Sequence, residues 1–265
     1  MDLKRKGERF MKILASNYDG TLCYGKKVMA EDSEAIRKWQ QAGNLFVIVT
    51  GRAKESLDKY LDKDGIKPDY YVTNNGSVIY DAQGNVLKSD FLDYTTAIDA
   101  IYIAKQLEGV ASYVVNDGYH RHRIIVDPNI EEHRYPNMKE DLCEEEVFNQ
   151  SNFSQIVLSM ANPDLAESLA EEFNLFFSEN IQAYANNYCV DLVAENVSKG
   201  TGLEYVAMYA DVDMDDVYAV GNLPKDIPML ELTQNRYAFF TSPSEIKDLC
   251  GHECMSIQEM IQEIL

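Results

Sequence analysis

Residues 12–22 read Lys-Ile-Leu-Ala-Ser-Asn-Tyr-Asp-Gly-Thr-Leu. The apolar run 13–15 predicts a buried strand, and Asp19-Gly20-Thr21 predicts a tight turn where that strand ends. Open α/β sheets place their chemistry at the carboxyl ends of parallel strands. We therefore expect this turn to lie at a functional site, with Asn17 and Asp19 as its first polar side chains.

Helices and strands are predicted to alternate on both sides of a long middle segment. From residue 13 to residue 73 the order is strand, helix, strand, helix, strand, which implies right-handed crossovers and a parallel sheet. The pattern resumes near residue 199. The predicted elements are a strand at 13–15, a helix at 32–42, a strand at 45–49, a helix at 53–61, a strand at 70–73, a helix at 199–209, strands at 217–220 and 237–241, and a helix at 257–264.

The middle segment has a different character, beginning near Ser77. It starts with a predicted hairpin whose turn contains Gly84, and it then mixes helices with alternating strands. The predicted elements are strands at 78–80 and 86–88, a helix at 95–107, a strand pair around Asp117-Gly118, a strand at 156–159, a helix at 163–173, and strands at 181–185 and 188–193. We expect an α/β core at 11–81 and 190–265, an α+β insert at 82–189, and an extension without periodic pattern at 1–10.

The composition limits the partners of the protein. The chain has 24 basic and 44 acidic residues and a formal net charge of −20, which argues against nucleic acid or an anionic membrane as a partner. No apolar run approaches the roughly 20 residues needed to cross a bilayer, and the N-terminus has no signal-peptide pattern. Five scattered cysteines fit free thiols in a reducing cytosol. The sequence predicts a cytoplasmic globular protein and specifies no oligomeric state.

Four separated segments carry a common pattern. They are Asp19-Gly20-Thr21-Leu22, Thr50-Gly51-Arg52, Lys199 at a helix start, and Gly221-Asn222-Leu223-Pro224-Lys225-Asp226. In order and spacing they resemble the four motif regions of the haloacid dehalogenase (HAD) superfamily. The insert resembles the C2-type cap of the Cof-like sugar-phosphate phosphatases, as does the segment that contains Asn75-Gly76. The resemblance implies a Rossmann-like parallel-sheet HAD core with an inserted cap.

The resemblance also implies an activity, the hydrolysis of a small phosphorylated metabolite such as a sugar phosphate. In the family an ionised Asp attacks phosphorus, a second Asp acts as acid and base, and Mg²⁺ neutralises the phosphate oxygens. Asp19 matches the acid/base, Thr50 the hydroxyl donor and Lys199 the phosphate lysine. The implied metal positions are Asn17, Asp19, Asn222 and Asp226, and the implied substrate-binding positions are Gly20, Thr21, Gly51, Arg52, Asn75, Gly76 and Lys225.

The sequence departs from the family pattern at three of these positions. Asn17 replaces the nucleophile, Asn222 replaces an Asp of the Gly-Asp-x-x-Asn-Asp motif, and Lys225 replaces its Asn. A carboxamide is neutral and a very poor nucleophile, so the covalent route is closed. The formal charge over the motif positions changes from about −4 to about −1, which removes most of the field that would hold a divalent cation. We expect Mg²⁺ binding to be weakened or absent. Lys225 is either a solvent-facing loop lysine or a cation in the place of the metal.

Two functions from different classes remain open. The first is a HAD-type phosphatase of weak activity, in which water attacks directly with help from Asp19. The second is a non-catalytic phospho-ligand binder or regulatory pseudophosphatase, because Thr50, Lys199 and Lys225 could hold a phosphate without metal.

A second polar stretch, Tyr119-His120-Arg121-His122-Arg123, falls on the predicted strand pair of the insert. Alternating charges on a strand are typical of a solvated face, and the alternative is contact with a ligand. The acidic run Glu144-Glu145-Glu146 is interpreted as solvated surface.

Overall fold

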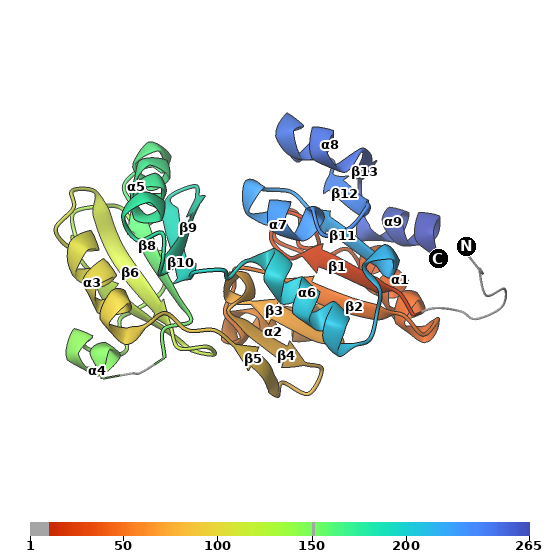
Figure 1. Ribbon diagram of the computed structural model, residues 1–265, viewed down its shortest axis with the longest axis horizontal. Helices are drawn as coiled ribbons and strands as arrows, with labels where there is room; N and C mark the ends of the chain where they lie inside the picture. The colour runs from red at the N-terminus through yellow and green to blue at the C-terminus, as the bar shows by residue number, and fades with distance from the viewer. Residues whose placement is uncertain (1–10, 150–151) are drawn as a thin grey trace.

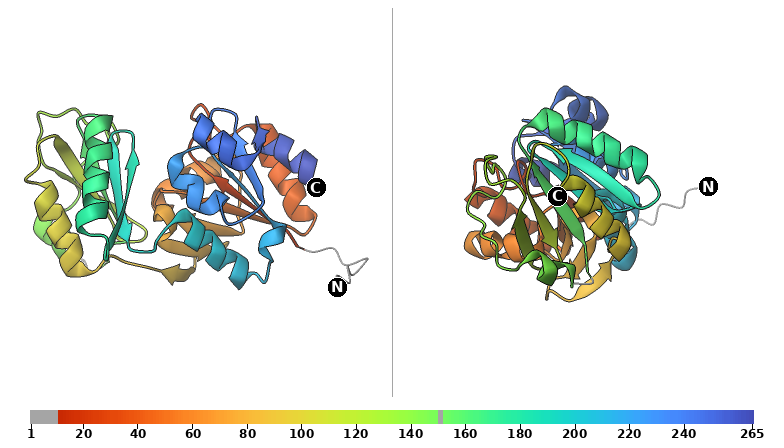
Figure 2. Two further views of the ribbon diagram at one scale, coloured as in Figure 1. Left: turned by 45° about the horizontal axis from the view of Figure 1, so that its top comes forward. Right: turned by 90° about the vertical axis from the view of Figure 1, so that its left-hand side faces the viewer.

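The computed structural model describes residues 11–149 and 152–265 and divides them between two sheets, each with its own helices (Figure 1). The two lobes lie side by side in Figure 1 and in the left view of Figure 2, and they are joined by two chain segments, one after β5 (Val86–Ser89) and one after β10 (Cys189–Ala194). The predicted α/β class with a parallel-dominated central sheet is confirmed.

The larger sheet has eight strands in the order β13-β12-β11-β1-β2-β3-β4-β5. All neighbours from β13 to β3 are parallel, and β4 and β5 add an antiparallel hairpin at one edge. The bounds of the strands are β1 (Ile13–Asn17), β2 (Leu45–Val49), β3 (Tyr70–Thr73), β4 (Val78–Asp81), β11 (Val217–Gly221), β12 (Asn235–Phe239) and β13 (His252–Cys254).

Strand β1 is buried along its whole length because helices cover both faces of this sheet. Its side chains alternate between two apolar clusters, as the period of a strand requires. Leu14 packs with Trp39 and Phe46 on the face covered by α1, α2 and α9, and Ile13 packs with Leu203 on the face covered by α6, α7 and α8. The helices are α1 (Ala30–Gln41), α2 (Lys54–Asp64), α6 (Lys199–Tyr209), α7 (Ile227–Leu230), α8 (Ser244–Cys250) and α9 (Ile257–Ile264).

The smaller sheet is antiparallel throughout, in the order β7-β6-β8-β10-β9. One face packs against its helices in a separate apolar cluster that includes Tyr113, Val115 and Leu192. The bounds are β6 (Val110–Asn116), β7 (Arg121–Ile125), β8 (Gln155–Met160) and β9 (Ile181–Asn186), with α3 (Tyr94–Ala104), α4 (Glu144–Phe148) and α5 (Pro163–Phe176).

Register decides which side chains of β7 face the other lobe. Arg121 pairs with Asn116 and His122 pairs with Val115, and residues opposite each other in a ladder share a face. Val115 belongs to the helix-covered cluster, so Asn116 and Arg121 lie on the opposite face. Arg121 and Arg123 therefore lie on one face of the small sheet, and His122 lies on the opposite face.

The pairings differ from the predicted limits of the insert at both ends. Strand β5 lies beyond residue 82 but pairs with β4 in the large sheet, and β10 extends to Ala194 but pairs with β8 and β9 in the small sheet. Local patterning predicts a hairpin but does not say which sheet its outer strand extends. The predicted extension 1–10 lies outside the described residues.

The interpretation of the acidic run as solvated surface is wrong for Glu144. This residue begins α4, and its carboxylate accepts hydrogen bonds from Lys105 Nζ at 2.6 Å and from the Tyr113 hydroxyl at 2.8 Å. Val147 of the same helix is fully buried. The elements α4, α7, α8 and β13 were not predicted, since they are short and carry little periodic signal.

Candidate active site

Most of the predicted site residues come from loops that follow neighbouring parallel strands, and Lys199 comes from the start of α6. Asn17 ends β1 and pairs with Val49, so Thr50 begins the adjacent loop. On the other side of β1, Ser16 pairs with Val220, one residue before Gly221. Parallel strands end at the same edge of a sheet, and the structure brings these loops together there.

A network of buried polar side chains joins the first and last of these loops. We call it the amide centre, and its members are Asn17, Thr21, Lys199, Asn222 and Asp226. Lys199 Nζ donates to Asn17 Oδ1 at 2.9 Å and to Asp226 Oδ1 at 2.5 Å. Asn17, Lys199 and Asp226 are at most 2% exposed.

The Asn17 amide nitrogen is surrounded by oxygen atoms. Its Nδ2 lies 2.7 Å from the Asp19 carbonyl oxygen, 2.7 Å from Asn222 Oδ1 and 3.4 Å from Thr21 Oγ1. An ammonium group needs an acceptor, so the contact with Lys199 assigns the Asn17 oxygen to one side and its nitrogen to the other. The carboxamide thus links a cation to converging oxygens, and it presents no nucleophilic oxygen.

Both oxygens of the buried Asp226 carboxylate are engaged. Oδ1 accepts from Lys199, and Oδ2 accepts from the backbone N–H groups of Asn222 and Leu223 at 2.8 and 3.0 Å. Ser198 places Lys199 at the start of α6, where it forms a reciprocal cap with Thr201.

The interpretation that Lys225 takes the place of a metal is wrong, because its ammonium group is not the one between Asn17 and Asp226. The ammonium between Asn17 and Asp226 belongs to Lys199, whereas Lys225 lines a separate cavity with residues of α5 and β9. Burial lowers the pKa of Lys225, and the charges of Lys199 and Arg134 add to this effect against the opposing charge of Asp191.

The carboxylate of Asp19 forms an ion pair with Arg52 and no hydrogen bond with the side chains of the amide centre among the described residues. The guanidinium donates through Nε and Nη2 to the two carboxylate oxygens at 2.7 and 2.6 Å, a bidentate geometry. Burial acts to raise the pKa of Asp19, but the hydrogen bonds and charge of Arg52, together with Arg134 and Lys225, lower it below its ordinary value. Asp19 is therefore a weak base and stays ionised in this pairing.

The turn Asn74–Gly76 (η1) lies between β3 and β4 and forms hydrogen bonds with the small-sheet lobe. Its three residues have positive φ values of 52°, 58° and 113°, a conformation that Asn and Gly tolerate best. Asn74 Nδ2 donates to Ser154 at 2.6 Å and Asn75 Nδ2 donates to Asp191 at 3.1 Å, both in the small-sheet lobe. Sequence reasoning missed Ser154 and Asp191. For Asp191 one signal was present, a single polar residue within an apolar strand pattern, and for Ser154 there was none.

Predicted glycines lie where loops of the site approach each other. A Cβ atom at Gly76 would lie 2.1 Å from the Ser198 carbonyl oxygen, directly before Lys199. A Cβ at Gly20 would lie 2.5 Å from Asn222 Nδ2, and one at Gly51 would lie 2.8 Å from Asn75 Oδ1. These contacts explain why the loops require glycine.

The residues at the implied metal positions do not fit Mg²⁺. This ion prefers an octahedron of hard oxygen ligands. Here Asn222 Oδ1 and the Asp19 carbonyl already accept from Asn17, and the single carboxylate directed into the centre, that of Asp226, is neutralised by Lys199. Within 11–149 and 152–265, no group of three or more His, Cys, Asp or Glu side chains could hold a metal ion.

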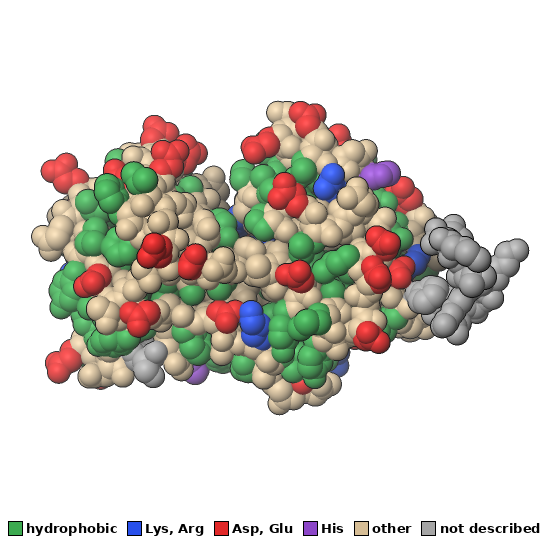
Figure 3. Space-filling view, viewed as in Figure 1, with side chains coloured by type: hydrophobic (Ala, Val, Ile, Leu, Met, Phe, Trp, Pro, Cys, Tyr) green, Lys and Arg blue, Asp and Glu red, His purple; other side chains and the backbone are tan. Residues whose placement is uncertain are grey.

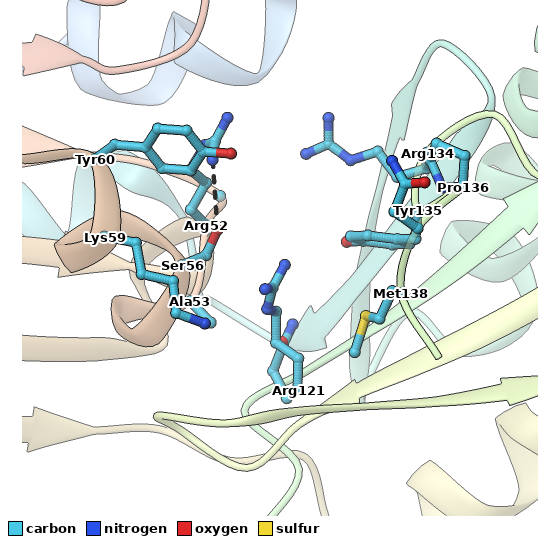
Figure 4. A pocket seen from close by; sticks show the side chains of 13 residues that line it. Arg52, Ala53, Ser56, Lys59, Tyr60, Arg121, Arg134, Tyr135, Pro136 and Met138 are labelled. Carbon is cyan, nitrogen blue, oxygen red and sulfur yellow. Dashed lines mark hydrogen bonds between the residues drawn. The ribbon is translucent and has the colours of Figure 1, made fainter. Parts of the chain in front are cut away.

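A cavity of about 300 Å³ lies between the lobes, next to this site (Figure 4). Arg52 and Tyr60 enter it from the large-sheet lobe, Arg134 and Tyr135 face them from the other lobe, and Arg121 rises between them (Figure 4). We call it the arginine pocket. Its lining residues are Gly51, Arg52, Ala53, Ser56, Lys59, Tyr60, Asn116, Arg121, Arg134, Tyr135, Pro136, Asn137 and Met138.

The fold and site define a class of proteins, and comparison with known sequences identifies it. The profile of the haloacid dehalogenase-like hydrolases matches residues 14–259. The chain therefore belongs to this family, whose members include phosphatases.

Particular relatives support the Cof-like assignment. Phosphatase YwpJ of Bacillus subtilis is 26% identical over 90% of this chain and 93% of its own length. The 5-amino-6-(5-phospho-D-ribitylamino)uracil phosphatase YwtE of the same organism is 23% identical over 90% and 91%. A Plasmodium vivax structure described as a HAD/COF-like hydrolase superimposes with a TM-score of 0.81 at 18% identity, covering 96% of this chain and 95% of that one. None of the described helices has the length and apolar character required of a membrane span.

Proposed function

We propose that this protein binds a small phosphorylated metabolite between its two lobes and does not hydrolyse it through an aspartyl-phosphate. The observation that carries the proposal is the Asn17 carboxamide, held by Lys199 on one side and by three oxygens on the other. It has no lone pair of carboxylate character to direct at phosphorus. The protein is then a pseudophosphatase with the fold of its enzymatic relatives.

Groups that can hold phosphate oxygens support the binding half of the proposal. Lys199 has three N–H bonds, and two of them are used within the amide centre. The Thr50 hydroxyl accepts from the Arg52 backbone N–H at 3.1 Å, and its own proton has no acceptor among the described residues. Both groups can donate to a phosphate without a metal ion.

We propose that the small-sheet lobe is the C2-type cap of this site. Its contacts through Ser154 and Asp191 with the turn Asn74–Gly76 support a closed arrangement. A ligand bound beneath it would be shielded from bulk water, which strengthens every charged contact inside.

The free state of all five cysteines supports the predicted cytoplasmic location.

Direct attack by water is the remaining route to hydrolysis, and the geometry disfavours it. A general base must abstract a proton, and its efficiency falls as its pKa drops below the working pH. Arg52 holds both oxygens of Asp19 and lowers its pKa. We therefore expect turnover to be weak or absent.

Two measurements on the same protein test the proposal. Phosphate release from a panel of sugar monophosphates should be weak or undetectable and should not depend on Mg²⁺, while calorimetry in EDTA should detect binding of at least one of them. Thr50→Val should weaken this binding, and the matched exposed substitution Thr95→Val should not. Metal-dependent release by the unmodified protein, or absence of binding by every phosphate ester, would contradict the proposal.

A further inference from the structure

The arginine pocket contains cations that the phosphate-binding groups do not need. Arg52 is committed to Asp19 and to Ser56, and Lys59 pairs with Glu55 at 2.7 Å. Arg121 and Arg134 form no ion pair with any described residue. The pocket therefore has two guanidinium groups with unused donors.

Arg121 is the more informative of the two because it is partly withdrawn from water. Its Nε is buried and has no hydrogen-bond partner among the described residues. A buried donor without a partner has lost its hydration and gained no hydrogen bond in return, and native structures rarely retain one without a reason. The β6–β7 register directs Arg121 into the pocket, where Figure 4 shows it rising between the two lobes.

The positive charge of the pocket contrasts with the rest of the molecule. The chain carries a net charge of −20, and acidic side chains are spread over both lobes of the face seen in Figure 3. Four cationic side chains nevertheless line one cavity, and none of its described lining residues is acidic. Mutual repulsion makes such a cluster unfavourable unless an anion occupies it, which indicates an anionic ligand.

The pocket adjoins the loop that carries Thr50, one of the phosphate-binding groups proposed above. Gly51 and Arg52, which directly follow Thr50, line it, and Arg134 is near enough to Asp19 to affect its pKa. One ligand can therefore reach both places. The cavity volume of about 300 Å³ falls within the range of small-molecule sites.

We propose that Arg121 and Arg134 bind a second anionic group, so that the ligand is a small metabolite with a phosphate ester at one end and a further phosphate or carboxylate at the other. This inference rests on the proposed function, because it takes the first phosphate to bind at Thr50 and Lys199. The planar guanidinium groups suit either anion through paired N–H donors.

Calorimetry in EDTA with matched ligands tests the inference. The probes are glucose 6-phosphate, glucose 1,6-bisphosphate and 6-phosphogluconate, with glucose as the uncharged reference. We expect at least one doubly anionic probe to bind about tenfold or more tightly than the monophosphate, as charge-assisted hydrogen bonds predict. The bisphosphate and the phosphocarboxylate arms distinguish the two kinds of second anion.

Variants then locate the preference. Arg134→Gln changes an exposed residue, so it should fold, and it should reduce the preference for the doubly anionic probe, taken as the ratio of its affinity to that of the monophosphate for the same variant, to about twofold or less. Arg121→Gln should do the same, and Arg121→Lys should retain part of the preference. Arg37→Gln removes a charge from the exposed side of α1 and should change nothing.

The outcomes separate this inference from the proposed function. If no phosphate ester binds, the proposed function is wrong, and the inference that rests on it is wrong as well. If single and double anions bind equally, or if Arg134→Gln and Arg121→Gln leave the preference intact, the inference is wrong and the proposed function stands.

Discussion

The amide centre and the arginine pocket lie next to each other and treat charge in opposite ways. In the amide centre the ammonium of Lys199 has both a carboxylate and a carbonyl partner, and all three participants are almost completely buried. In the arginine pocket, Arg121 and Arg134 have no carboxylate partner among the described residues. A satisfied network holds a structure together, whereas unsatisfied donors are available to a ligand. We infer that the amide centre serves mainly stability, with only the third N–H bond of Lys199 left for phosphate, and that the arginine pocket serves recognition.

The largest expected effect is on stability. Lys199→Met leaves the buried Asp226 carboxylate without its counter-charge, and we expect the free energy of unfolding to fall by about 3–5 kcal/mol. Urea denaturation measures this. The double variant Lys199→Met/Asp226→Asn should recover part of the loss, and Arg134→Gln should stay within about 0.5 kcal/mol of the parent protein. Equal effects of Lys199→Met and Arg134→Gln would erase the contrast between the two regions.

The next prediction concerns metal binding at the amide centre. Asn17→Asp replaces the Nδ2 donor with an acceptor that faces the Asp19 carbonyl and Asn222 Oδ1. We expect a loss of about 1–3 kcal/mol in EDTA, partly restored by Mg²⁺ because binding to the folded state stabilises it. Thermal melting with and without the ion measures both effects.

Two controls sharpen the metal prediction. The parent protein should show no Mg²⁺-dependent change in melting temperature, and the exposed substitution Asn187→Asp should show none either. A similar Mg²⁺-dependent shift in the parent protein would mean that its amide centre binds the ion after all.

A smaller effect is expected at acid pH from the Asp19–Arg52 pair. The pKa of Asp19 is lowered in the folded state, so its contribution is present above the ordinary Asp pKa of about 4 and is lost as the pH falls through the folded value. Its side chain is 40% exposed, which limits the contribution to at most about 1 kcal/mol. Arg52→Met should reduce the difference in unfolding free energy between neutral and acid pH. If this difference is unchanged in Arg52→Met, the Asp19–Arg52 pair does not contribute to the free energy of unfolding.

The smallest effect tests the register of β7. His120 is exposed beside Asp117, outside the arginine pocket, so His120→Gln should change the unfolding free energy by less than about 0.5 kcal/mol. It should also leave the affinity for the doubly anionic probes unchanged. A loss of affinity comparable to that of Arg121→Gln would show that the whole His-Arg stretch faces the ligand.

Much of the fold could be predicted from local patterns. The continuous apolar run of β2 and the glycine after α2 are signals that neighbouring residues carry by themselves. The edges of the insert could not be placed in this way, because β5 and β10 have the composition of strands that could join either sheet. Only their pairing partners decide.

The sequence could predict which loop residues gather at the candidate site, but not which side chains contact one another there. The loops after β1, β2 and β11 meet because parallel strands end at one edge, so Asn17, Thr50 and Asp226 could be grouped from their positions in the chain. Ser154 and Asp191 were missed because they join the site through contacts between the lobes, which no local pattern encodes.

The sequence by itself determined the alternation of helix and strand, the edge at which the loops gather, and the absence of a carboxylate at position 17. Each follows from chemistry within a few residues. Tertiary structure decided that Lys199, not Lys225, contacts Asn17 across 182 positions of the chain, and that Arg121, not His122, faces the pocket. These outcomes depend on strand register and helix placement, which are set by packing among segments far apart in the chain.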